Sequence, residues 1–234
     1  MADEIELTPE PGILIESLRD IGYSFNSALA DIIDNSITAH AQNISIFAMP
    51  VDDSFKVAII DDGDGLGRSE LLQAMRLGST NPRDERTSGD LGRFGLGLKT
   101  ASFSQCRRLT VVSRQAGKTT AFTWDLDTVV KDNSWSVLER TDCEHIFAIN
   151  KLPATGTMVL WEKVDRLTGC NGSGKVDYER VVSESQDYLS LVFHRFLSGE
   201  KAFRESAYLS TGDALTPSTH LIPRMKPPKF PPRK

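Results

Sequence analysis

Apolar residues along this chain recur with two different periods. Spacing near the helical repeat predicts helices over residues 11–22, 24–39, 69–77 and 175–197. Apolar runs rich in β-branched and aromatic residues predict strands over residues 43–49, 55–61, 109–113, 119–126, 145–149 and 158–164. Because helices come first and a long series of strands follows, the order indicates an α+β fold. We expect a two-layer α/β sandwich with a mixed, mostly antiparallel sheet, rather than a doubly wound parallel sheet.

The second predicted helix has an apolar stripe and a polar stripe on different faces. The apolar stripe comprises Leu29, Ile32, Ile33 and Ile37, and the polar stripe comprises Asp31, Asp34, Asn35 and Thr38. Asp31 and Asn35 are one helical turn apart. A carboxylate that can hold a water as a base would therefore lie beside an amide oxygen that can bind a divalent cation. The alternative is an ordinary solvated face of an amphipathic helix.

The strand predicted over residues 55–61 runs into Asp61-Asp-Gly-Asp-Gly-Leu66, a sequence suited to a ligand-binding loop. Gly63 and Gly65 lack a Cβ, so the backbone can turn sharply or approach a ligand closely there. The Asp61 carboxylate can accept a hydrogen bond from an amino group such as that of adenine. Asp and Gly are also common turn formers, so a simple hairpin turn or a loop for a hard cation remains an alternative.

A glycine-rich segment follows, in which residues 91–102 read Leu-Gly-Arg-Phe-Gly-Leu-Gly-Leu-Lys-Thr-Ala-Ser. Free backbone N–H groups ahead of a helix would suit phosphate oxygens, and Lys99 adds a cation. The segment matches neither a Walker loop nor a well-placed dinucleotide fingerprint. Residues 78–90, which precede it, are polar and rich in loop formers, as expected of a mobile cover over a site.

In this order and spacing, the three segments resemble the N, G1 and G2 boxes of the GHKL ATP-binding superfamily, which includes gyrase, heat-shock chaperone, histidine kinase, MutL and MORC proteins. The resemblance covers residues 10–198 and is nearest to MORC-like and related prokaryotic ATPases. It implies a Bergerat-type fold that binds ATP with Mg²⁺. By position in the boxes, it assigns Asp61 and Thr157 to the adenine amino group, Gly63 and Gly65 to the adenine ring, Asn35 to magnesium, and Gly92, Gly95, Gly97 and Lys99 to the phosphates.

Two positions depart from the pattern of the superfamily. Hydrolytic members carry Glu four residues before the magnesium-binding Asn, whereas this chain has Asp31. Aspartate is one methylene shorter, and catalysis is sensitive to displacements of about 1 Å. An acid at this position still favours hydrolysis, with Asp31 as the catalytic base. The second departure is Asp62, where many relatives have Asn and to which the sequence assigns no consequence.

The resemblance implies a slow, Mg²⁺-dependent ATPase in which nucleotide-driven closure of a lid controls dimerisation or engagement of a partner. Two alternatives stay open: a non-hydrolysing module that senses ATP, and a protein kinase of the histidine-kinase kind. The expected partners are ATP, a second copy of the chain in a nucleotide-dependent homodimer, and a protein partner or transducer domain that the sequence does not identify.

Composition is consistent with one globular domain followed by an irregular segment. With 234 residues and 39% hydrophobic content the chain can bury a sizeable core, and no apolar run is long enough to cross a bilayer. The first residues do not resemble an export signal, and three widely spaced cysteines do not form a disulfide framework, so we expect a cytoplasmic protein. We assign residues 1–198 to the ATP-binding domain and residues 199–234, which end in a Pro/Lys-rich run, to an appendage.

Charge gives no support to a role in binding nucleic acid. The net charge of −5 argues against extensive coating of DNA or RNA, although a local basic patch is compatible with it. We interpret Arg107 and Arg108 as a solvated strand entry rather than as a nucleic-acid contact. The histidines show no spacing typical of metal ligands.

Overall fold

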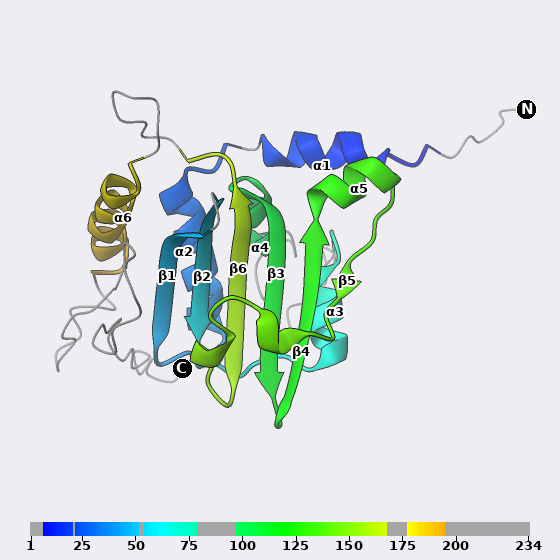
Figure 1. Cartoon of the computed structure of the whole chain (residues 1–234). Helices are drawn as coiled ribbons and strands as arrows, with labels where there is room; N and C mark the ends of the chain where they lie inside the picture. Colours follow the sequence, from blue (N-terminus) through cyan, green and yellow to red (C-terminus); the bar gives the residue numbers. More distant parts are fainter. Residues whose placement is uncertain (1–6, 21, 52–53, 79–96, 168–176, 195–234) are drawn as a thin grey trace, which may run out of the picture.

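Strands from distant parts of the chain form one sheet in the computed structural model, which describes residues 7–20, 22–51, 54–78, 97–167 and 177–194. The order across the sheet is β1-β2-β6-β3-β4-β5, and each pair of neighbouring strands is antiparallel (Figure 1). The strands are β1 (Ile44–Val51), β2 (Ser54–Asp61), β3 (Cys106–Gln115), β4 (Lys118–Asp125), β5 (Leu138–Glu139) and β6 (Gly156–Val164). Late in the chain, β6 inserts between two hairpins and joins them into one surface.

Helices cover one face of this sheet and one of its ends (Figure 1). They are α1 (Pro11–Arg19), α2 (Phe25–Thr38), α3 (Arg68–Met75), α4 (Gly97–Phe103), α5 (Leu126–Asp132) and α6 (Tyr178–Val192). α2 packs against α4 and α6, and α1 packs against α5. The stacked rings of Phe55 and Tyr178, with centroids 4.5 Å apart, attach α6 to the sheet. The predicted α+β two-layer architecture is confirmed.

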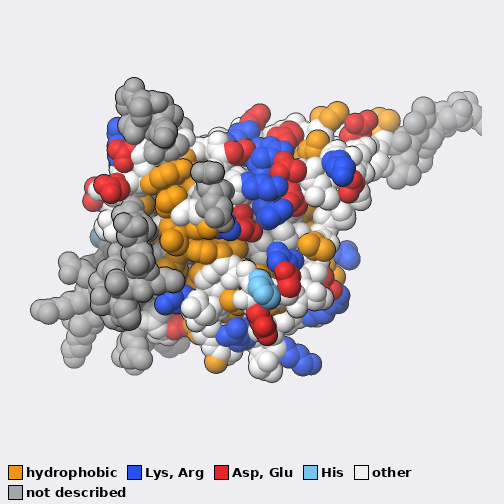
Figure 2. Space-filling model, in the orientation of Figure 1, with side chains coloured by type: hydrophobic (Ala, Val, Ile, Leu, Met, Phe, Trp, Pro, Cys, Tyr) orange, Lys and Arg blue, Asp and Glu red, His pale blue; other side chains and the backbone are white. Residues whose placement is uncertain are grey.

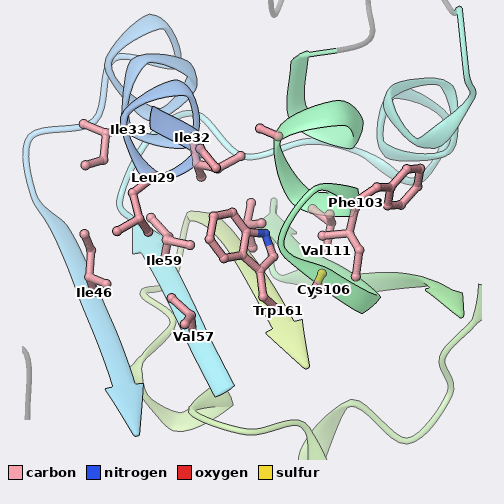
Figure 3. Close-up of a cluster of buried hydrophobic side chains, with 14 of the residues drawn as sticks. Leu29, Ile32, Ile33, Ile46, Val57, Ile59, Phe103, Cys106, Val111 and Trp161 are labelled. Carbon is pink, nitrogen blue, oxygen red and sulfur yellow. The ribbon is translucent and has the colours of Figure 1, made fainter. Parts of the chain in front are cut away.

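The main core lies between the sheet and α2 and α4. Alternation along the strands directs every second side chain towards the helices, where the apolar stripe of α2 meets it. Figure 3 shows this contact, with labelled residues Leu29, Ile32, Ile33, Ile46, Val57, Ile59, Phe103, Cys106, Val111 and Trp161. Full burial of a Leu or Ile side chain contributes about 1.5–3 kcal/mol, so this stripe fixes which face of α2 turns towards the sheet. The polar stripe of α2 therefore does not face this core.

A second, smaller core lies on the opposite face of the sheet. Ala58, Ile60, Val112, Met158 and Leu160 belong to it, and Ile146 and Leu152 from the segment between β5 and β6 pack on them. Figure 2 views this face and shows apolar side chains gathered over β1, β2 and β6.

Charged side chains at one end of β3, β4 and β6 are paired with one another. Arg107 Nε lies 2.5 Å from Asp127 Oδ1, and Arg108 Nη2 lies 2.6 Å from Asp125 Oδ2. Lys163 Nζ lies 2.6 Å from Asp127 Oδ2. Both arginines of the pair noted in the sequence therefore neutralise nearby carboxylates. Such partly exposed surface pairs contribute about 1 kcal/mol each.

The strand predicted over residues 145–149 is wrong. The structure has two 3₁₀ turns there, η1 (Cys143–His145) and η2 (Ile149–Lys151), separated by Ala148 in the left-handed conformation with φ of 60°. Ile146 is buried as an anchor of this loop on the second core, not as part of a strand. The strand predicted over residues 119–126 ends at Asp125 in the structure, one residue before the predicted end. It ends there because Asp125 caps α5 by accepting a hydrogen bond from Asp127 N.

In the part of the chain that the structure describes, no helix has both the length and the apolar character needed to cross a bilayer. The predicted appendage at residues 199–234 lies outside the described residues.

Candidate nucleotide-binding site

The centre of the candidate site is Asp61, the last residue of β2. Its side chain is only 6% exposed, and both carboxylate oxygens accept hydrogen bonds. Oδ1 accepts from Gly63 N at 3.0 Å and from Thr157 N at 3.1 Å, and Oδ2 accepts from Ser36 Oγ at 2.8 Å. Burial raises the pKa of Asp61, while the hydrogen bonds oppose that shift. One further hydrogen-bond donor would stabilise the charged form of this buried carboxylate, and an amino group of a ligand can supply that donor.

Thr157 reaches Asp61 because β6 begins very close to the end of β2. A Cβ at Gly156, whose φ is 146°, would lie 2.0 Å from the carbonyl oxygen of Asp61. Glycine at residue 156 is therefore required by the protein's own backbone. The structure thus brings together Asp61 and Thr157, two of the predicted adenine-side residues, from distant parts of the sequence.

We predict that Gly156→Ala lowers the free energy of unfolding by about 2–5 kcal/mol, because it combines backbone strain with a steric clash. Gly117→Ala is the matched control, since Gly117 also has positive φ, at 74°, but has no atom within 4 Å of a built Cβ. That control should lose only about 1–2 kcal/mol. Urea unfolding of both variants measures the difference, and equal losses would contradict the clash.

Two further side chains that sequence analysis did not identify complete this region. Ser36 lies on α2 directly after Asn35 and donates to Asp61, so it links the polar part of α2 to the end of β2. Ser113 Oγ on β3 accepts from Leu66 N at 2.7 Å, donates to Gly156 O at 3.2 Å and lies 3.1 Å from Thr157 Oγ1. Both serines fix the loop around Asp61 from neighbouring elements.

The loop after β2 is wedged between α2 and β3. A Cβ at Gly63 would lie 2.5 Å from the carbonyl oxygen of Ala39, and a Cβ at Gly65 would lie 2.4 Å from that of Arg114. Gly65 also has φ of 65°, a conformation that side chains with a Cβ rarely adopt. Both predicted glycines are therefore required by close approach to the protein backbone, and their contact with adenine stays a prediction.

Asp62, which had no assigned role, holds the turn that leads from α2 into β1. Its Oδ1 accepts from the backbone N of Gln42 and of Asn43, each at 2.7 Å. Its Oδ2 accepts from Asn43 Nδ2 at 2.6 Å. The neighbouring Asp64 adds a second link, since its backbone N donates to Ala39 O at 2.9 Å. The departure at residue 62 thus has a structural explanation.

Asp31 and Asn35 are half-buried on the polar side of α2. Partial burial raises the pKa of Asp34, and the nearby charge of Asp31 raises it further. Within the described residues, the Asn35 side chain makes no hydrogen bond to other protein groups, so its amide oxygen is available as a cation ligand. Asn35 immediately precedes Ser36, which ties this part of α2 to Asp61.

Lys99 lies on α4, but its ammonium group is directed at the end of α3. Nζ donates to the carbonyl oxygens of Ala74 at 2.7 Å and of Arg76 at 2.6 Å. The residue is 2% exposed, and burial lowers the pKa of Lys99 to about 8. In this structure Lys99 therefore connects α4 to the C-terminal end of α3. Of the glycines predicted to hold phosphates, Gly97 begins α4, whereas Gly92 and Gly95 lie outside the described residues. Residues 79–90 of the polar segment before them also lie outside the described residues.

Residues 23–156, more than half of the chain, match the family described as histidine kinase-, DNA gyrase B-, and HSP90-like ATPase. This match spans α2, the Asp61 loop and α4, the elements that build the site. The chain belongs to this family, the GHKL superfamily. The domain is thus of an ATP-binding, ATPase type, as the resemblance of its motifs implied.

Individual GHKL relatives are more distant. The chain is 27% identical over 168 residues to ATPase morc-1 of Caenorhabditis elegans, and this match covers 63% of this chain and 19% of ATPase morc-1. It is 31% identical over 98 residues to the DNA mismatch repair protein MutL of Rhodopseudomonas palustris, covering 42% of this chain and 16% of MutL. It is 28% identical over 171 residues to the chaperone protein HtpG of Nitrobacter winogradskyi, covering 68% of this chain and 24% of HtpG. The chain thus spans a quarter or less of the length of these relatives.

Proposed function

We propose that this GHKL domain binds ATP with Mg²⁺ and hydrolyses it slowly. The observation that carries the proposal is the buried Asp61 carboxylate, held by donors from α2, its own loop and β6. A purine amino group is a suitable further donor to this acceptor. Asp61 and Thr157 would recognise adenine, Gly63 and Gly65 would lie along the ring, and the backbone around Gly92, Gly95 and Gly97 would hold the phosphates.

The polar side of α2 would supply the metal ligand and the base. The amide oxygen of Asn35 suits Mg²⁺, an ion that prefers oxygen ligands and binds alongside nucleotide phosphates. Asp31, one turn earlier, would hold the attacking water and take its proton. Lys99 would contribute its positive charge to the phosphates only if its ammonium group exchanged its hydrogen bonds to the α3 carbonyl oxygens for hydrogen bonds to phosphate oxygens. Its more direct contribution is to fix α4 against α3.

We predict that Asn35→Ala weakens Mg²⁺-dependent ATP binding by about 10-fold or more, because an oxygen ligand of the ion is lost. Calorimetric titration with ATP, with and without Mg²⁺, measures the effect. Asn150→Ala is the control, since it removes the same side chain from the exposed turn η2. An unchanged dependence on magnesium in Asn35→Ala would remove this residue from the metal site.

Nucleotide binding would in turn control association. We infer that closure over bound ATP promotes a homodimer or the engagement of a protein partner, and support for this comes from the family to which the chain belongs. Light scattering with and without a non-hydrolysable ATP analogue tests it. Two other functions are candidates for the same site. An ATP-sensing module without turnover would bind ATP but release no phosphate in a single-turnover assay. A protein kinase would transfer phosphate to a partner protein.

A further inference from the structure

Three polar side chains form a row across the ends of three neighbouring strands. Asp61 ends β2, Thr157 lies at the start of β6 and Ser113 lies near the end of β3, and these strands are adjacent in the sheet (Figure 1). Hydrogen bonds join the row, since Thr157 N donates to Asp61 Oδ1 at 3.1 Å and Ser113 Oγ lies 3.1 Å from Thr157 Oγ1. Because side chains alternate along a strand, all three lie on the helix-covered face, each two residues from a main-core residue of its strand: Ile59, Val159 and Val111.

The other partners of Ser113 determine the direction of its hydrogen bond with Thr157. A hydroxyl group has one hydrogen to donate and two lone pairs that can accept. Ser113 is fully buried, and its Oγ accepts from Leu66 N at 2.7 Å and donates its hydrogen to Gly156 O at 3.2 Å. The backbone N–H can only donate and the carbonyl oxygen can only accept, so these two roles are fixed. One lone pair of Ser113 is left, and Thr157 is therefore the donor in the bond between the two hydroxyls.

A hydroxyl that donates inwards presents its oxygen as an acceptor on the side of the site. The hydrogen of Thr157 Oγ1 is directed at Ser113, so the lone pairs of this half-buried side chain are what a ligand meets. Asp61 beside it is an acceptor too: its Oδ1 already accepts two backbone N–H groups, and among the described residues its Oδ2 accepts only from Ser36 Oγ. The side chains of Asp61 and Thr157 thus offer a ligand two acceptors and no donor.

We propose that Ser113 is a positioning residue for Thr157 that sets the base specificity of the site. By accepting the Thr157 hydrogen, it restricts the site to a purine that carries an amino group, rather than a carbonyl oxygen, at carbon 6. The inference rests on the proposed function, since it concerns the recognition of adenine there. Hypoxanthine has the same ring with a carbonyl oxygen at that carbon, and this oxygen would face two acceptors without a hydrogen-bond partner.

The test compares ATP with inosine triphosphate, whose base is hypoxanthine, by calorimetric titration of Ser113→Ala and native protein. The native protein should bind ATP at least 10-fold more tightly. In Ser113→Ala the Thr157 hydroxyl is released to rotate and can donate to the carbonyl oxygen of hypoxanthine. The ratio of the two affinities should then fall about 3–10-fold, the gain expected from one neutral hydrogen bond. A purely structural role would weaken both nucleotides equally, so an unchanged ratio would overturn the inference.

Thr110→Val is the matched control for loss of a buried hydroxyl from β3. Thr110 Oγ1 lies 2.9 Å from Thr123 Oγ1, so this pair resembles the pair of Ser113 and Thr157. It lies on the opposite face of the sheet, because Thr110 alternates with the main-core residues on either side of it. The ratio of ATP to inosine triphosphate affinity should stay at the native value in this variant.

Thr157→Val examines the same inference without disturbing the other bonds of Ser113. It keeps the backbone N–H that donates to Asp61 and removes only the hydroxyl, so ATP affinity should fall about 3–10-fold. In this background Ser113→Ala should have no further effect on the ratio. Native ATP affinity in Thr157→Val, or an equal change of the ratio in both backgrounds, overturns the role of Ser113 and leaves Asp61-dependent ATP binding in place. Absence of ATP binding in the native protein overturns the proposed function and this inference together.

Discussion

Asp61→Asn is expected to bind ATP about 10–100-fold more weakly than the native protein. The amide keeps one oxygen, which can still accept from Gly63 N and Thr157 N, and its nitrogen can donate to Ser36 Oγ. The acceptor offered to adenine is then lost, and an unpaired buried donor costs about 1–3 kcal/mol, or one to two decades of affinity. Asp61→Ala should lose at least as much affinity, together with stability, because it leaves three donors of the protein without their acceptor.

Calorimetric titration with ATP and with GTP makes the result specific to the base. Guanine presents a carbonyl oxygen where adenine presents its amino group, so the native carboxylate should reject GTP and Asp61→Asn should discriminate less. Asp64→Asn controls for loss of charge, because Asp64 lies in the same loop with its side chain 65% exposed. Equal ATP affinities for Asp61→Asn, Asp61→Ala and native protein would exclude Asp61 from the base pocket.

Sequence patterns predicted the elements whose burial follows a regular period. The stripe that contains Leu29 and Ile32 predicted α2 to within a residue at each end, and the apolar alternation over residues 43–61 predicted the hairpin of β1 and β2. The pattern failed at residues 145–149, because Ile146 is buried by a loop that packs on a sheet already formed. Burial of that kind depends on tertiary contacts, and no local period reports it.

The candidate site likewise combines features that a local sequence pattern indicates with features that depend on tertiary contacts. The loop sequence already made Asp61 a candidate acceptor, but Thr157 was assigned only through the resemblance, because no local signal connects residues 96 positions apart. Ser36 and Ser113 were overlooked, although each lies at a position where its own element is otherwise apolar: Ser36 continues the buried stripe of α2, and Ser113 continues the inward series of β3. A polar residue in a buried register needs a hydrogen-bond partner, and that is the signal that points to both.

Lys99 illustrates a limit that no sequence pattern removes. A lysine after a glycine-rich segment is a reasonable phosphate ligand, and its four-carbon stem can also reach elsewhere. Here the ammonium reaches the carbonyls at the end of α3, residues that come before the glycine-rich segment in the chain. Which acceptor a flexible cation selects depends on the packing of two helices, so only the structure reveals it.

The largest expected effect is on the chemical step: Asp31→Asn should keep ATP binding and lower turnover by about 10²–10⁴-fold, the usual contribution of a general base. The amide has nearly the shape of the carboxylate but cannot take a proton from water. Asp31→Glu should be active and faster than the native protein, because the added methylene restores the reach found in hydrolytic GHKL members. The two substitutions therefore move the rate in opposite directions if reach limits the native enzyme.

Steady-state phosphate release at saturating ATP, with binding measured separately, tests this pair of variants. Asp34→Asn is the control, because it removes the same charge from the neighbouring turn of α2, where Asp34 is more exposed than Asp31. Its rate should stay close to the native value, since Asp34 has no proposed contact with the water. Turnover that survives in Asp31→Asn would place the base on another residue. Normal ATP binding without turnover in the native protein would instead favour the ATP-sensing module, in which a shorter acid holds nucleotide without cleaving it.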